Sequence, residues 1–138
     1  MIRLTAIAVA IVAAASATAA EWVYDLERGL DSYTITGDGG TVVLVCDPDR
    51  AYNPDKSYAN FVVEMPVAQS VTQVVFLAET GEQAAFMTRE GIATQQDADA
   101  EEWSDLIAMA QAGGRIAVVT EDDSFTVTAD PMPELRCD

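Results

Sequence analysis

Histidine is absent from this chain, and only 7 Lys and Arg residues stand against 23 Asp and Glu residues. Without histidine, the Ser-His-Asp and Cys-His arrangements are excluded, and so are most transition-metal sites. The shortage of cations argues against nucleic acid and anionic membrane partners, because both are bound through Lys and Arg. No dinucleotide fingerprint or phosphate-binding loop occurs in the sequence. We therefore predict no cofactor and no catalytic residues.

The N-terminal residues form a predicted signal peptide. Arg3 precedes an apolar run over 4–15, and small residues over 17–20 end at Ala20. This order is typical of secretion, and the run is shorter than the about 20 apolar residues of a membrane span. We predict a signal over 1–20, cleaved after Ala19 or Ala20, and a periplasmic or secreted protein without membrane insertion after cleavage.

Residues 21–138 have the length and apolar content of a single globular domain. The predicted cleavage removes one Arg and no acid, so the net charge of −16 becomes −17. A surface this acidic would attract a cationic protein electrostatically. The expected partner is therefore a protein, and a cationic one is favoured by the charge.

Cys46 and Cys137 are the two cysteines of the chain. In an oxidising compartment they are expected to form a structural disulfide. By closing a long loop, this bond would lower the entropy of the unfolded chain and stabilise the fold by about 4–5 kcal/mol. An intermolecular bond, free thiols, a redox pair and a metal site are the alternatives. The wide spacing and the lack of histidine disfavour the last two.

Short alternating or β-branched runs predict a mainly β fold. Trp22, Tyr24 and Leu26 alternate with Val23 and Asp25 within 21–27, which predicts a half-buried first strand. Runs over 32–36 and 41–46, joined by Gly37-Asp38-Gly39-Gly40, predict a hairpin whose second strand is central and ends at Cys46. The turn superficially resembles a phosphate cradle, but no helix follows it. Further strands are expected over 59–65, 71–78, 83–89, 115–120 and 124–128.

One helix is predicted over 100–112, where Trp103, Leu106, Ile107 and Ala110 share an apolar face. Asp99 is its expected N-cap, and Glu102 stands at the position of a reciprocal capping box. The helix should end at Gly113-Gly114. The expected architecture is an antiparallel sandwich or partly open barrel with one helix in the C-terminal third; the alternative is an α+β fold with the helix across a sheet face.

Tryptophan and methionine are interpreted as core residues. Trp22 and Trp103 lie on apolar-periodic faces, which favours packing over sugar stacking. The methionines of the domain are dispersed, without the paired spacing of a copper(I) site. Those predicted to fill the core are Met65, Met87, Met109 and Met132.

The loop over 47–58 is the candidate recognition surface, since ordered loops of this length are often functional. It holds two tyrosines and two basic residues, and Tyr and Arg are enriched at binding hot spots. The candidate partner-binding residues are Arg50, Tyr52, Lys56 and Tyr58. A less favoured alternative is a calcium site formed by Asp47, Asp49, Asn53 and Asp55.

A second acidic segment begins like an EF-hand loop at Asp97. Glu102 replaces the glycine expected at its sixth position, and Ala108 replaces the bidentate glutamate at its twelfth. We interpret this segment as the start of the helix, and no metal is predicted there.

Several features occur in an order similar to that of small exported bacterial proteins of the invasion-associated locus B type. They are Trp22, the strand ending in Cys46, the run Phe61-Val62-Val63, the helix over 101–112 and Phe125-x-Val127 before Cys137. The resemblance implies a single β-rich domain with disulfide-linked cysteines. It also implies a non-catalytic periplasmic or surface role in host or envelope interaction.

The function predicted from the sequence is that of an exported, non-catalytic binding or accessory protein of the bacterial periplasm or envelope. One alternative is an acidic inhibitor of a cationic enzyme such as a lysozyme. Another is a carboxylate-dependent glycoside hydrolase, because that chemistry needs two acids and no histidine.

Overall fold

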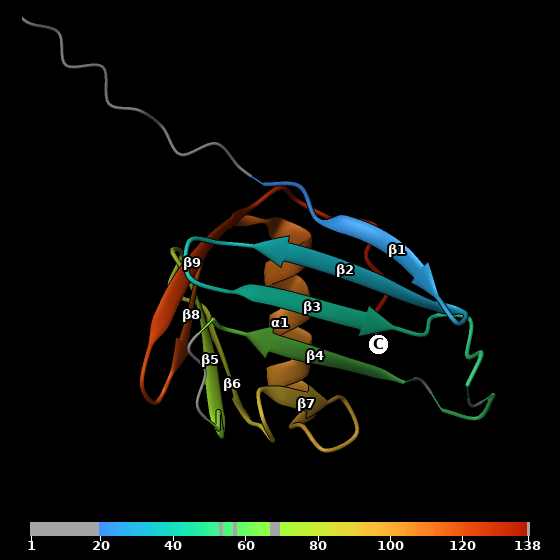
Figure 1. The fold of residues 1–138 in the computed structure, drawn as a ribbon. Helices are drawn as coiled ribbons and strands as arrows, with labels where there is room; N and C mark the ends of the chain where they lie inside the picture. Colours follow the sequence, from blue (N-terminus) through green and yellow to red (C-terminus); the bar gives the residue numbers. More distant parts are fainter. Residues whose placement is uncertain (1–19, 53, 57, 67–69, 138) are drawn as a thin grey trace, which may run out of the picture.

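A computed structural model describes residues 20–52, 54–56, 58–66 and 70–137. Within these residues the chain is mainly β, with two open antiparallel sheets and one helix (Figure 1). The first sheet has the order β1-β2-β3-β4-β7, and the second has the order β6-β5-β8-β9. The elements are β1 (Val23–Glu27), β2 (Leu30–Thr36), β3 (Thr41–Cys46), β4 (Ala59–Glu64), β5 (Gln73–Ala78), β6 (Gln83–Met87), β7 (Ile92–Thr94), α1 (Ala100–Ala112), β8 (Gly114–Thr120) and β9 (Ser124–Ala129).

The hairpin of β2 and β3 confirms the sequence prediction. Its register pairs Thr36 with Thr41, and β3 lies centrally, between β2 and β4. The glycine turn packs against the other sheet, where a Cβ on Gly40 would lie 2.5 Å from a ring carbon of Phe125. Glycine at this turn is therefore explained by close packing of the two sheets.

The helix begins and ends where the sequence predicts. Asp99 Oδ1 accepts hydrogen bonds from the N–H groups of Glu101 and Glu102, and Gly113 follows with φ 70°. The expected capping box is wrong in one respect. The carboxylate of Glu102 accepts the N–H of Ala85 in β6 at 2.8 Å, so it connects the helix to a strand.

Aromatic rings from both sheets and the helix meet in the core. Phe61 of β4 packs edge-on against Phe76 and Phe86, with ring centroids 5.2 and 4.9 Å away. Trp103 of α1 stacks on the same ring at 6.3 Å. In Figure 1 the helix passes behind β2, β3 and β4, while β1 lies to one side of it.

The C-terminal segment is held beside the helix by a disulfide and two hydrogen bonds. Cys46, at the end of β3, is bonded to Cys137, as predicted. The indole N–H of Trp103 donates to the carbonyl of Cys137 at 2.8 Å, and the Gln111 amide donates to the carbonyl of Leu135 at 3.0 Å. The disulfide and the helix therefore fix the same short segment.

Ala20 connects the start of the described chain to the second sheet. Its N–H donates to the Thr128 carbonyl at 2.7 Å, and its own carbonyl accepts from Asp130 at 3.0 Å. Three residues later, Val23 pairs with Thr34 in the first sheet. The chain thus passes from one sheet to the other between these two residues.

Three expectations about strands and core need correction. The first strand was expected to be half-buried, yet every residue of β1 is exposed. Met87 was expected in the core and is 77% exposed at the end of β6, whereas Met109 is buried and Met65 and Met132 are partly buried. Strand β7 was not expected, because three residues are too few for a periodic pattern.

Candidate partner-binding surface

The segment 47–58, hereafter the tyrosine loop, is organised by one buried carboxylate. Asp47 is 2% exposed, and its two oxygens accept the N–H groups of Ala51 at 2.7 Å and Tyr52 at 2.9 Å. Its carbonyl accepts the N–H of Arg50, which has a φ of 56°. Side-chain capping of this kind replaces backbone pairing and fixes the path of residues 47–52.

The fixed path presents a pair of aromatic rings. Tyr52 is 58% exposed and stacks on Tyr58 with ring centroids 6.1 Å apart. The Tyr58 hydroxyl in turn accepts the side-chain amide of Asn60 in β4 at 3.0 Å. Tyr52 is therefore an exposed aromatic side chain whose support extends into the first sheet.

The two predicted cationic residues of the loop have different settings. Arg50 Nη1 donates to the Pro54 carbonyl at 3.4 Å, so this side chain lies along its own loop. Lys56 has an exposed side chain on the same loop. The structure therefore brings Tyr52 and Tyr58 together and leaves both cations exposed on the same loop.

The tyrosine loop adjoins the turn between β1 and β2. Glu27, Arg28, Ser32, Tyr52 and Asn60 share a surface hollow of about 330 Å³. The turn itself has two central residues with positive φ, Arg28 at 53° and Gly29 at 81°. Strand β1 and the loop are thus parts of one continuous surface.

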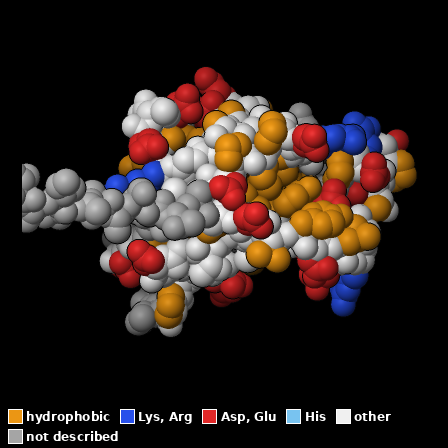
Figure 2. All heavy atoms as spheres, turned by 90° about the horizontal axis from the view of Figure 1, so that it is seen from above, with side chains coloured by type: hydrophobic (Ala, Val, Ile, Leu, Met, Phe, Trp, Pro, Cys, Tyr) orange, Lys and Arg blue, Asp and Glu red, His pale blue; other side chains and the backbone are white. Residues whose placement is uncertain are grey.

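Strand β1, hereafter the β1 edge, exposes three large hydrophobic side chains to solvent. Val23, Tyr24 and Leu26 are 66%, 55% and 60% exposed. Tyr24 and Leu26 point to the same side of the sheet as Trp22, which reaches the core and lines a small internal cavity with Leu106. Figure 2, seen from above, shows hydrophobic side chains gathered together, with acidic side chains along their border and Lys and Arg side chains at the right-hand end.

The Asp31 carboxylate of β2 interacts with a tyrosine of the β1 edge, Tyr24, and with Tyr33 of β2. The Tyr24 hydroxyl donates to Asp31 Oδ1 at 2.8 Å, and this hydrogen bond raises the pKa of Tyr24. Burial, followed by the charge of Asp31, raises the pKa of Tyr33, whose ring lies 5.4 Å from that of Tyr24. Both phenols therefore stay protonated to a higher pH than an ordinary tyrosine, and that of Tyr24 donates its hydrogen bond to Asp31.

The candidate calcium residues do not share one setting. Asp47 is engaged by the backbone of its own loop, and Asp49 and Asp55 are exposed. Asn53 lies outside the described residues. Within the described part of the chain, His, Cys, Asp and Glu form no group of three or more that could hold a metal ion. At the helix start, Asp99 caps backbone N–H groups, as interpreted from the sequence.

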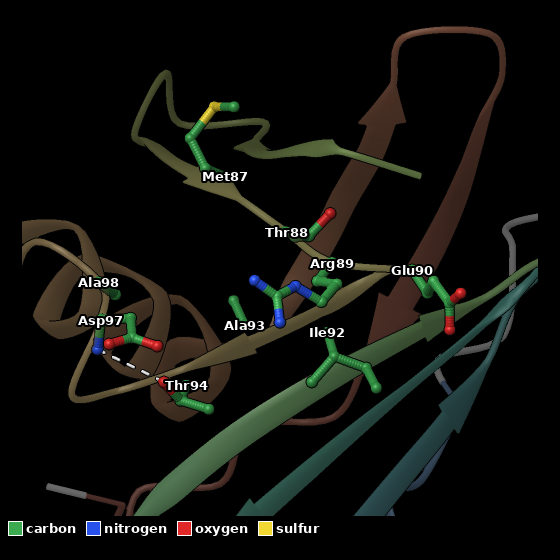
Figure 3. Close-up of a pocket in the computed structure, with 9 residues that line it drawn as sticks. All are labelled: Met87, Thr88, Arg89, Glu90, Ile92, Ala93, Thr94, Asp97 and Ala98. Atoms are coloured by element: carbon green, nitrogen blue, oxygen red, sulfur yellow. Dashed lines mark hydrogen bonds between the residues drawn. The ribbon is translucent and has the colours of Figure 1, made fainter. Parts of the chain in front are cut away.

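A separate hollow of about 440 Å³ lies between the end of β6 and β7 (Figure 3). Met87 and Ile92 give it an exposed apolar rim. The Arg89 guanidinium points into it on the side of Asp97, while the Glu90 carboxylate points the other way. Asp97 lies on the same side of the hollow as the Arg89 guanidinium, so an anionic ligand would meet opposing charges there.

The sequence predicts the tyrosine loop as a partner-binding surface but does not single out the β1 edge. The alternation of Trp22, Tyr24 and Leu26 predicts a half-buried strand, and these side chains do share one side of the sheet. What the pattern does not contain is the position of the helix, which covers Trp22 and leaves the other two side chains in water. The sequence signal for an exposed strand is the pair of acids, Asp25 and Glu27, at positions that alternate with Tyr24 and Leu26.

Comparison with family models, curated proteins and solved structures gives no match to this chain. The resemblance to proteins of the invasion-associated locus B type therefore stays a prediction from the sequence. Within the described residues, no helix is long and apolar enough to cross a membrane.

Proposed function

We propose that this chain is an exported, non-catalytic binding protein of the bacterial periplasm or envelope that holds a cationic protein partner. The observation that carries the proposal is the exposed ring of Tyr52, supported by Tyr58 and fixed by the Asp47 carboxylate. A rigid, exposed aromatic side chain loses little conformational entropy on binding and is typical of interface hot spots.

Charge supports the choice of partner. The chain carries 23 acidic residues and 7 basic ones, so its field attracts positively charged proteins and repels acidic ones. Acidic side chains also border the hydrophobic patch in Figure 2, with Lys and Arg side chains at one end of it. A disulfide between Cys46 and Cys137 is compatible with the oxidising compartment in which such a partner would be met.

The proposal is tested by capture from an envelope extract with the exported protein immobilised, followed by identification of what is retained. A Tyr52→Ala variant should lose about tenfold or more in affinity for the retained protein. Met87→Ala, at an exposed site on the other sheet, is the matched control. Equal retention by all three proteins would refute a role for the tyrosine loop.

The inhibitor hypothesis is tested with a basic lysozyme as the partner. A stable complex at low ionic strength that dissociates as salt rises would support it, since surface charge attraction is screened by salt. Co-elution is read by size-exclusion chromatography. If the lysozyme elutes alone and keeps full activity, the inhibitor hypothesis is wrong while the wider binding proposal is still testable in the extract.

A further inference from the structure

The strongest unexplained feature is the backbone of the β1 edge. The Arg28-Gly29 turn has two residues, so Glu27 and Leu30 close the hairpin as a hydrogen-bonded pair. Hydrogen-bonded and non-hydrogen-bonded pairs alternate along an antiparallel ladder. The pairs of Tyr24 with Tyr33 and of Leu26 with Asp31 are therefore non-hydrogen-bonded.

The backbone groups of Tyr24 and Leu26 consequently point away from β2. Within the described part of the chain, no hydrogen bond reaches the N–H or C=O of either residue. Their spacing and orientation match those that a neighbouring strand uses. The β1 edge thus offers a row of donors and acceptors to an added strand.

Each of the other sheet edges is shorter or has a backbone group that is bonded to another part of the chain. Strand β7 has three residues. Ala85 of β6 donates its N–H to Glu102, and Ala129 of β9 forms a bridge with Ala20. Within the described part of the chain, β1 is the edge of five or more residues whose outward backbone groups make no hydrogen bond.

We propose that the β1 edge binds an extended segment of the partner by strand addition, and that this segment alternates apolar residues with Lys or Arg. This inference rests on the proposed function and specifies how the cationic partner is bound. On one side of the sheet the added strand would lie beside Tyr24 and Leu26, which favours apolar side chains. On the other side it would lie beside Asp25 and Glu27, which favours basic ones.

A second copy of the chain fits this edge less well. Symmetric antiparallel pairing of Tyr24 with Leu26 places Asp25 opposite Asp25 of the other copy. Pairing Leu26 with itself places Asp25 opposite Glu27, and pairing Tyr24 with itself brings Glu27 opposite Glu21. Each register sets like charges face to face, which destabilises the pair, and each copy also carries a large negative charge.

The test uses the exported protein and a short synthetic peptide that alternates valine with lysine; a peptide alternating valine with glutamate is the control. Binding is measured by titration calorimetry, and backbone amide exchange is followed by NMR. The lysine peptide should bind at low salt and slow the exchange of the Tyr24 and Leu26 amides. The glutamate peptide should not bind.

Two variants separate strand addition from general charge attraction. Leu26→Pro removes an outward N–H and leaves the pairing with β2 intact, because proline is tolerated on an edge strand. Asp25→Lys with Glu27→Lys reverses the local charge, and Glu82→Lys with Asp122→Lys makes the same change at two exposed turns of the other sheet. The first two variants should weaken binding by about tenfold or more, and the control variant by much less.

Several results would overturn the inference. They are full affinity in Leu26→Pro, equal losses in the two charge-reversed variants, binding without protection of the two amides, and a dimer joined through β1. Failure here is distinct from failure of the proposed function. A partner that depends on Tyr52 but is unaffected by Leu26→Pro would leave the binding proposal standing and remove strand addition alone.

Discussion

The edge strands β1 and β6 belong to different sheets and differ in how far the rest of the chain covers them. On β6, Ala84 and Phe86 are buried and the N–H of Ala85 is accepted by the Glu102 carboxylate. On β1 all five residues are exposed. One acidic residue in the first turn of a helix is enough to occupy an edge backbone group, and a strand beyond the reach of the helix keeps such groups available.

Loss of the disulfide is expected to have the largest effect on stability, and it concerns the sheet that contains β1. Cys46→Ser with Cys137→Ser should lower the free energy of unfolding by about 4–5 kcal/mol, because the closed loop is long. The bond also supports the C-terminal segment that accepts the Trp103 indole N–H. Urea unfolding with and without reductant measures the difference, and an unchanged midpoint in the double variant would contradict it.

Truncation of one aromatic side chain on each edge strand tests the comparison directly. Phe86→Ala in β6 should cost about 3–5 kcal/mol, because it leaves a cavity beside Phe61 and Trp103. Tyr24→Ala in β1 should change stability by less than about 1 kcal/mol, since its ring is largely in water. Thermal unfolding compares them, and equal losses would mean that the β1 edge is covered in solution.

Loss of the helix-to-strand hydrogen bond should have a moderate effect. Glu102→Ala leaves the part-buried N–H of Ala85 without its acceptor and should cost about 1–2 kcal/mol. The neighbouring Glu101→Ala is the control, because that side chain is exposed. Its loss should cost only a few tenths of a kcal/mol, through the interaction of its charge with the helix dipole. Faster exchange of the Ala85 amide in the first variant alone would identify the bond as the cause.

The smallest expected effect concerns pH. Glu121 accepts the N–H of Thr72 at 2.7 Å, and this bond lowers its pKa below the ordinary 4.5. A lowered pKa in the folded state means that the contribution is present above the ordinary value and is lost as the pH falls through the folded one. NMR titration should show the shift, and Glu121→Gln should flatten the acid side of the stability curve. A Glu121 pKa at or above 4.5 would contradict this.

The sequence predicted those elements whose signals are local. The helix ends were defined by Asp99 and Gly113, and the central hairpin by the glycine turn before β3. The disulfide was predicted because the chain has two cysteines and its predicted compartment is oxidising. For each of these, the residues that determine the structure lie close together in the chain or have one possible partner.

The rest depended on distances that no local pattern contains. Glu102 is placed correctly for a capping box, yet Ala85 lies within reach and its N–H is the group that Glu102 accepts. Tyr24 and Leu26 have the alternation of a half-buried strand, but burial needs a covering element and the helix does not extend that far. Of the candidate site, the tyrosine loop could be predicted from its composition, whereas its capping by Asp47 and its continuity with β1 could not.

The Ala20 bridge gives the predicted signal cleavage a structural consequence. Cleavage after Ala19 would make Ala20 the first residue, and its new ammonium group would be the donor to the Thr128 carbonyl in β9. Cleavage after Ala20 would remove that donor, together with the Ala20 carbonyl that accepts the N–H of Asp130. A shift of one residue in proteolytic processing therefore decides whether the mature N-terminus joins the two sheets or begins outside their contact.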